Sequence, residues 1–291
     1  MKKDITALFC FVDDFCKIVD HWISKQLLSQ QPHRKPTRTP EMAISEIMSI
    51  ILLYQQSPCK NFKYFYESYV PLYRQDFPSL VSYNRFLELK PRALYYLACL
   101  VEWYCKQGRR TGISYIDSTP IAVWHNKRIS RNKLWKGVAK IGKTTKGWFL
   151  GLKLHIVINE NGELQGVRLS RGNVDDRAVV PHLTSRLTGL LFGDKGYIKQ
   201  ELFQELYSRN LKLVTGIKKG MKNKLMPIFE KILLRKRSIV ETVFSVMKQY
   251  FELEHTRHRF IWNALVHIFS TIIAYSLKAK KPTISPFINT I

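Results

Sequence analysis

Three acidic residues occupy positions where a carboxylate could do chemistry. Asp117 and Asp194 each directly follow a short apolar run, and Glu241 lies within the apolar segment Ile239–Phe244. A charge in such a setting is costly unless it is paired or bound to a metal ion. We expect both aspartates to lie at strand ends, where a carboxylate can emerge into a cleft.

Phosphodiester chemistry is one use for three such acids. Two divalent ions about 4 Å apart can activate an attacking oxygen and stabilise a leaving oxygen. Mg²⁺ prefers hard oxygen ligands, so three carboxylates and a phosphate suffice. The pattern indicates a site for two Mg²⁺ (or Mn²⁺) ions held by Asp117, Asp194 and Glu241. The alternative is that the aspartates cap the following elements and that Glu241 lies on a solvated helix face.

The charge of the chain indicates a polyanionic partner. Lys and Arg total 47 against 22 Asp and Glu, which gives a net charge of +25. Because the basic residues are spread along the chain, we expect a long positive surface that binds double-stranded DNA. RNA, or an acidic membrane surface, could attract the same charge. Hydrophobic residues make up 45% of the chain, enough for a sizeable core.

The cysteines and the apolar segments argue against a secreted or membrane protein. The five cysteines form no CxxC pair, so neither a disulfide framework nor a zinc site is indicated. The most apolar stretch, Ile261–Leu277, contains Asn263 and His267 and is interpreted as a buried helix. We expect a protein of the reducing cytoplasm with no membrane partner.

Periodicity predicts a helical N-terminal domain at 1–110 and an α/β catalytic domain at 111–291, with a linker at 107–112 between the two patterns. Predicted strands and helices of the second domain follow in the order strand 113–116, strands 148–159 and 164–170 around a turn at 160–162, helix 177–187, strand 190–192, helix 200–208, strand 211–217 and helix 238–251. This order predicts a mixed sheet flanked by helices.

The helix that carries Glu241 is amphipathic. One face carries polar residues spaced by four, four and three positions: Arg237, Glu241, Ser245 and Lys248. The other face is predicted to pack in the core and carries Val243, Phe244, Met247, Tyr250 and Phe251. A carboxylate flanked by cations suits a ligand that is both metal-bound and rich in phosphate. A solvent-exposed face with ion pairs is the alternative.

A basic segment between the first two predicted strands is the main candidate for DNA contacts. Its cations include Lys136, Lys140, Lys143 and Lys146, and no acid interrupts it. We expect them to bind phosphates, together with Lys195, Arg237 and Lys248. Trp135 and Trp148 could stack on an unpaired base or pack in the core. Asp175 and Asp176 are expected to cap a helix, with metal binding as the less favoured role.

The motifs together resemble those of a known family. Three motifs are similar to those of the DDE transposases of bacterial insertion sequences, most of all to the insertion-sequence 982 family. They are Tyr-Ile-Asp117-Ser-Thr-Pro, Phe-Gly-Asp194-Lys-Gly-Tyr and Arg237-x3-Glu241-x6-Lys248. The resemblance extends over nearly the whole chain and includes Trp148–His155 and Gly172–Arg177. One departure is Leu234, where related families often place a Tyr, so a contact made by that Tyr is not carried over.

This resemblance implies a fold, an activity and partners. It implies an RNase H-like catalytic core in which Asp117, Asp194 and Glu241 hold two ions, so that insertion-sequence ends are cleaved and the 3′-hydroxyl is joined to target DNA. The N-terminal helices would bind the terminal inverted repeats, with a helix-turn-helix near Ser79–Leu87, or would have a purely structural or dimerising role. A homodimer or higher assembly would hold two ends in a nucleoid-associated complex. A non-catalytic repressor, or a metal-dependent nuclease without strand transfer, is the competing function.

Overall fold

The computed structural model describes residues 5–27, 40–124, 134–144, 147–221, 225–254, 258 and 260–284. By its internal contacts the chain divides into two units. Unit 1 comprises Met1–Val101 and His258–Ala274, and unit 2 comprises Glu102–Arg257 and Tyr275–Ile291. The chain therefore leaves unit 1 once and returns to it near the C-terminus.

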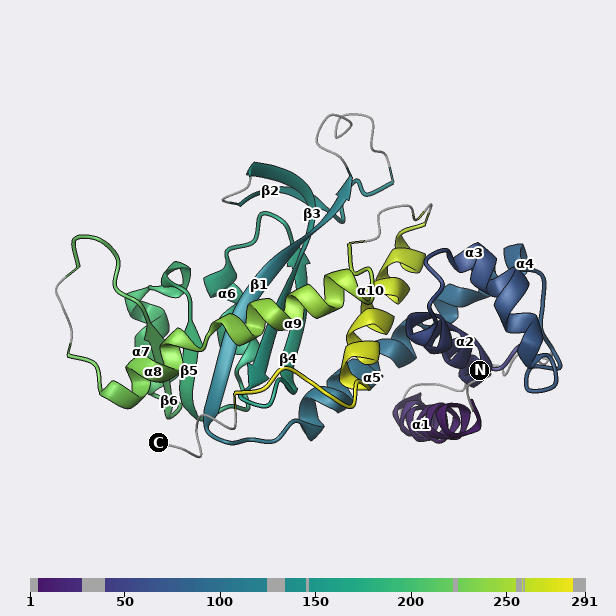
Figure 1. Ribbon diagram of the computed structural model, residues 1–291, viewed down its shortest axis with the longest axis horizontal. Coiled ribbons are helices and arrows are strands. Elements are labelled where there is room, and N and C mark those ends of the chain that lie inside the picture. Colours follow the sequence, from purple (N-terminus) through teal and green to yellow (C-terminus); the bar gives the residue numbers. More distant parts are fainter. Residues whose placement is uncertain are drawn as a thin grey trace. The chain divides into compact units, whose positions relative to one another are not determined.

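Every element assigned to the described residues of unit 1 is helical (Figure 1). They are α1 Thr6–Leu27, α2 Ile44–Gln56, α3 Phe62–Tyr64, a π-helical turn Phe65–Tyr69, 3₁₀ turns Val70–Tyr73 and Lys90–Ala93, α4 Tyr83–Leu89, most of α5 Leu94–Gln107 and most of α10 Ile261–Ser276. Helices α2 and α5 lie in the part of the chain, 1–110, for which periodicity predicts helices. The interpretation of 261–277 as a buried helix is confirmed by α10. Of the helices in the described ranges, none has the length and apolar character needed to cross a membrane.

Helix α2 forms the centre of unit 1 because it is apolar on all sides, as a fully buried helix must be. Its residues from Ile47 to Leu53 are all buried. Near its end the buried side chain of Gln55 donates from Nε2 to Ser270 Oγ of α10 at 3.0 Å. This hydrogen bond satisfies a buried amide and connects the C-terminal helix to the N-terminal helices.

A six-stranded mixed sheet forms the centre of unit 2. Its strands are β1 Ile113–Trp124, β2 Lys140–Thr144, β3 Gly147–Asn159, β4 Leu164–Arg171, β5 Gly189–Gly193 and β6 Leu211–Thr215. The order is β2-β3-β1-β5-β6, and β4 also pairs with β3. Strands β1, β2 and β4 are antiparallel to β3, whereas β5 is parallel to both β1 and β6. The mixed sheet expected from the sequence is confirmed.

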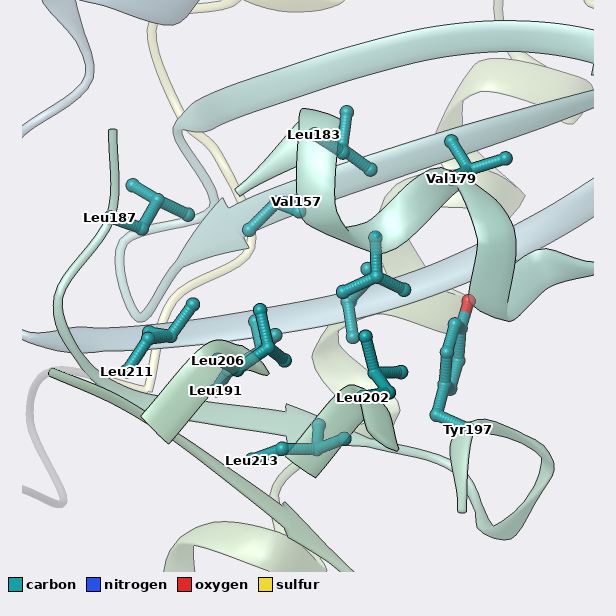
Figure 2. Close-up of a cluster of buried hydrophobic side chains, with 12 residues drawn as sticks. Val157, Val179, Leu183, Leu187, Leu191, Tyr197, Leu202, Leu206, Leu211 and Leu213 are labelled. Carbon is teal, nitrogen blue, oxygen red and sulfur yellow. The ribbon is translucent and has the colours of Figure 1, made fainter. Parts of the chain in front are cut away.

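Helices cover the two faces of this sheet. They are α6 Asp176–Leu183, a 3₁₀ turn Lys195–Tyr197, α7 Gln200–Tyr207, α8 Ile228–Arg235 and α9 Ser238–Gln249. Figure 2 shows leucines and valines of α6 and α7 packed over Leu191 of β5 and Leu213 of β6. Ile116 of β1 belongs to the same cluster, whereas its neighbour Asp117 contacts a residue at the start of α9. Because alternate strand residues point to opposite faces, α6 and α9 lie on opposite sides of β1 (Figure 1).

Strand β1 is longer than predicted, and Asp117 lies within it instead of at its end. The short apolar run predicted a strand that ends at Ile116, directly before Asp117. However, β1 pairs with β5 only through Ile113–Tyr115 and with β3 over its whole length. Beyond Tyr115 one edge of β1 has no strand partner in the described residues, and Pro120 is tolerated there.

Candidate active site

Asp117 and Asp194 extend from neighbouring strands beside a pair of stacked rings. Tyr115 of β1 is in register with Phe192 of β5, and their ring centroids are 5.3 Å apart. Each aspartate lies two residues beyond one of these rings, so the period of a strand places both carboxylates on the side of the sheet that the rings occupy. Asp194 directly follows β5 in an extended conformation and precedes the 3₁₀ turn.

Arg237 connects two of the three acids. It lies at the N-terminus of α9, one helical turn before Glu241. Its Nη1 donates to Asp117 Oδ2 at 3.1 Å, and its Nη2 donates to Glu241 Oε1 at 3.0 Å. Arg237 and Asp117 are each 21% exposed at their side chains, and Glu241 is 59% exposed. Two carboxylates from β1 and α9 therefore direct oxygen atoms at one cationic group.

The electrostatics of Asp117 bring the third acid into the same neighbourhood. Burial raises the pKa of Asp117 to about 6, whereas the backbone N–H of Ser118 and the charge of Arg237 oppose this rise. The negative charges of Glu241 and Asp194 raise the pKa of Asp117 further. Asp117 and Glu241 are 124 positions apart in the sequence. Asp117 nevertheless interacts through space with both Glu241 and Asp194.

The chemistry of these acids fits a divalent ion, because Mg²⁺ and Mn²⁺ prefer carboxylate oxygens. Asp117 and Glu241 already share a cation, the Arg237 guanidinium. Across the ranges that the structure describes, however, no three His, Cys, Asp or Glu side chains gather closely enough to hold a metal ion. The side chains of Asp194 and Glu241 are exposed.

Two further predicted cations lie near the acids in the sequence but make different contacts. Lys248, on the last turn of α9, pairs with Glu254 at 2.6 Å and is 28% exposed. Lys195 is exposed, and its stem lies against Gly216: a Cβ added there would be 3.0 Å from Lys195 Cε. Lys195 thus extends past the end of β6, while the charge of Lys248 is engaged within the protein.

Part of the basic segment, Lys140–Thr144, forms a strand, β2, that the sequence did not predict. Lys140 and Lys143 are exposed on β2, and Lys136 is exposed in the turn before it, while Lys146 lies outside the described residues. The Lys143 Nζ is 5.4 Å from the centre of the Trp148 ring on β3. Trp148 is 58% exposed, so it does not pack in the core, and its stacking on an unpaired base stays a prediction.

Trp135 instead packs in the core, since it is only 3% exposed.

The C-terminal end of α9 differs from the prediction. Val243, Phe244 and Met247 are buried as expected, but Tyr250 is 67% exposed. The helix ends at Gln249, and the helical period no longer assigns a face to the residue after it.

Asp175 and Asp176 have separate roles. Asp175 is the N-cap of α6: its Oδ1 accepts from the backbone N–H of Arg177 at 2.9 Å, and its carboxylate pairs with the Arg177 side chain. The capping prediction is confirmed for Asp175. Asp176 instead points to the sheet, where Lys153 and Ser118 donate to its two oxygens.

A mixed sheet that carries interacting carboxylates, in a chain of net charge +25, is consistent with a protein that acts on DNA. Residues 107–261 match the protein-family model described as the transposase DDE domain, which is more than half of the 291 residues. The chain belongs to this family of DDE transposases. No curated protein matches it.

Proposed function

We propose that this protein cleaves DNA at the ends of a bacterial insertion sequence and joins the freed 3′-hydroxyl to target DNA. The observation that carries the proposal is that Arg237 pairs with both Asp117 and Glu241 inside the region that matches the transposase DDE domain. An RNase H-like fold is proposed for unit 2, supported by antiparallel β1, β3 and β4 followed by parallel β5 and β6. Membership of the insertion-sequence 982 family is proposed from the sequence motifs.

Asp117, Asp194 and Glu241 are the residues that would hold two Mg²⁺ or Mn²⁺ ions. When bound, such ions activate the attacking oxygen and stabilise the leaving oxygen of a phosphodiester. In the first reaction, water attacks phosphorus and the P–O3′ bond breaks, which leaves a 3′-hydroxyl and a 5′-phosphate. In the second, that hydroxyl attacks a target phosphodiester and displaces its O3′. No covalent bond to the protein forms in either step.

The exposed cations of unit 2 are proposed to bind the DNA backbone. Lys195 extends beside Asp194, and Lys140 and Lys143 lie on the outer strand β2. Arg237 is proposed to bind a phosphate next to the acids. To do so it would have to exchange its pairs with Asp117 and Glu241, as Lys248 would have to leave Glu254. Synapsis of two element ends requires two active sites, which supports a homodimer or larger assembly on DNA.

The test uses the purified full chain, its flanking element ends and Mg²⁺ or Mn²⁺. We expect metal-dependent cleavage at the 3′ ends, followed by products joined to a target plasmid, and loss of both with Glu241→Gln. Gln has nearly the shape of Glu but lacks the charge that holds an ion. Cleavage without joined products would indicate a nuclease alone. Salt-dependent DNA binding with no cleavage, unchanged in Glu241→Gln, would indicate a repressor and overturn the proposal.

A further inference from the structure

A polar cluster lies behind Asp117, on the face of the sheet that α6 covers. Lys153 Nζ donates to Asp176 Oδ1 at 2.7 Å, and Ser118 Oγ donates to Asp176 Oδ2 at 2.9 Å. Lys153 Nζ also donates to the carbonyl of Val174 at 2.7 Å. The two oxygens of Asp176 therefore connect strand β3, through Lys153, with strand β1, through Ser118.

Val174, whose carbonyl accepts from Lys153, packs against the hydrophobic cluster that Figure 2 shows. The Lys153 side chain is only 15% exposed and that of Asp176 is 34% exposed. A lysine at this depth requires an acidic partner, because an unpaired buried charge is strongly destabilising. His155 is its buried neighbour on β3, and burial lowers the pKa of His155 to about 4, so it is neutral at pH 7. Asp176 is thus the acid that balances Lys153.

Strand β1 needs such a connection at this point. Its pairing with β5 ends at Tyr115, so Asp117 lies two residues beyond the last strand partner on that edge. The Ser118 side chain is held by Asp176, and the Ser118 backbone N–H donates to Asp117 Oδ1 at 2.8 Å. Fixing Ser118 therefore fixes both the strand and the orientation of the Asp117 carboxylate.

We propose that Asp176, held by Lys153, is a positioning residue that orients Asp117 through Ser118. This inference rests on the proposed function, since it gives Asp117 the role of an ion ligand. Groups that hold metal ligands in place typically change ion affinity or activity by about 10–100-fold when removed. Asp176 does so from the opposite face of the sheet, without touching DNA or the ions.

The experiment measures Mn²⁺ binding to the full chain by calorimetry, and cleavage rate as a function of Mn²⁺ concentration. We expect Asp176→Ala and Ser118→Ala each to weaken Mn²⁺ binding about 10-fold or more. The double variant should be no worse than either single one, because both break the same connection. Asp176→Asn, which keeps an acceptor for Ser118, should recover part of the affinity.

Asp175→Ala is the matched control. It removes the adjacent acid of the same helix turn, with its own cation Arg177, and should lower the melting temperature while leaving Mn²⁺ affinity within about 2-fold. Wild-type affinity in both Asp176→Ala and Ser118→Ala, or an equal loss in Asp175→Ala, would overturn the positioning role alone. A wild-type chain that neither binds Mn²⁺ nor cleaves DNA would overturn the proposed function, and this inference with it. If Asp176→Ala does not fold, Ser118→Ala decides the question.

Discussion

Replacing Asp117 by Asn is expected to stabilise the folded chain in the absence of divalent ions and to abolish cleavage, by about 10³-fold or more. The stabilisation follows from burial, which raises the pKa of Asp117 from 3.8 to about 6. A shift of about two pKa units corresponds to at most about 3 kcal/mol. For a unit of this size, that is a rise of several °C in melting temperature, about 2–4 °C per kcal/mol.

The sign of the pH dependence follows from the direction of this shift. Because the folded pKa of Asp117 is the higher one, the folded state holds this proton more tightly than the unfolded state does. The contribution of Asp117 to stability is therefore fully present below about pH 4 and is lost as the pH rises through about 6. Asn cannot ionise, so Asp117→Asn should exceed the wild type in stability most at pH 7 and above, and by little near pH 4.

Thermal unfolding of both proteins from pH 4 to 8, with EDTA, measures this difference. Asp175→Asn is the matched control with the opposite sign, because Arg177 lowers the pKa of Asp175 and its charge stabilises the fold. Adding Mn²⁺ should stabilise the wild type, by about 2.7 kcal/mol at one hundred times its dissociation constant, but not Asp117→Asn. Equal stability of wild type and Asp117→Asn across this pH range would contradict the burial argument.

Much of the sheet could be predicted because its signals are local. The turn Glu160-Asn161-Gly162 needs a residue with positive φ, and Gly162 has a φ of +69° there. The strands on either side, β3 and β4, begin and end within about one residue of the prediction. Strand β2 was missed because its signal is not local: Gly142 lies against the backbone of Gly172, where an added Cβ would be 2.2 Å from the carbonyl oxygen.

The candidate site could be predicted in part for the same reason. Acids that follow apolar runs are visible in the sequence, and so is the helix face shared by Arg237 and Glu241. The pairing of Arg237 with Asp117, 120 positions away, depends on how α9 crosses β1. Likewise Asp176 is 58 positions from Ser118, and the sequence predicted helix capping, or less favourably metal binding, but not this hydrogen bond. Their roles in catalysis remain proposals.

Gly151→Ala is expected to be among the most destabilising single substitutions in unit 2. Gly151 lies on β3 opposite Ala122 of β1, next to a shift in register. A Cβ at Gly151 would be 2.0 Å from the carbonyl oxygen of Ile121 and 3.2 Å from the Cα of Ala122. Both are backbone atoms, so the methyl group can be accommodated only if β1 and β3 move apart.

We expect a loss of about 3 kcal/mol in the free energy of unfolding, measured with denaturant on the full chain. Gly196→Ala is the control: its Cβ meets nothing within 4 Å and its φ is not positive, so its change should stay within about 0.5 kcal/mol. Wild-type stability of Gly151→Ala would show that the two strands are less closely paired than the structure has them.

Because β2 pairs with β3 at Gly151, separating β1 from β3 also displaces Lys140 and Lys143. DNA binding by Gly151→Ala should then weaken and depend less steeply on salt, since each lost phosphate contact reduces the salt slope by about one.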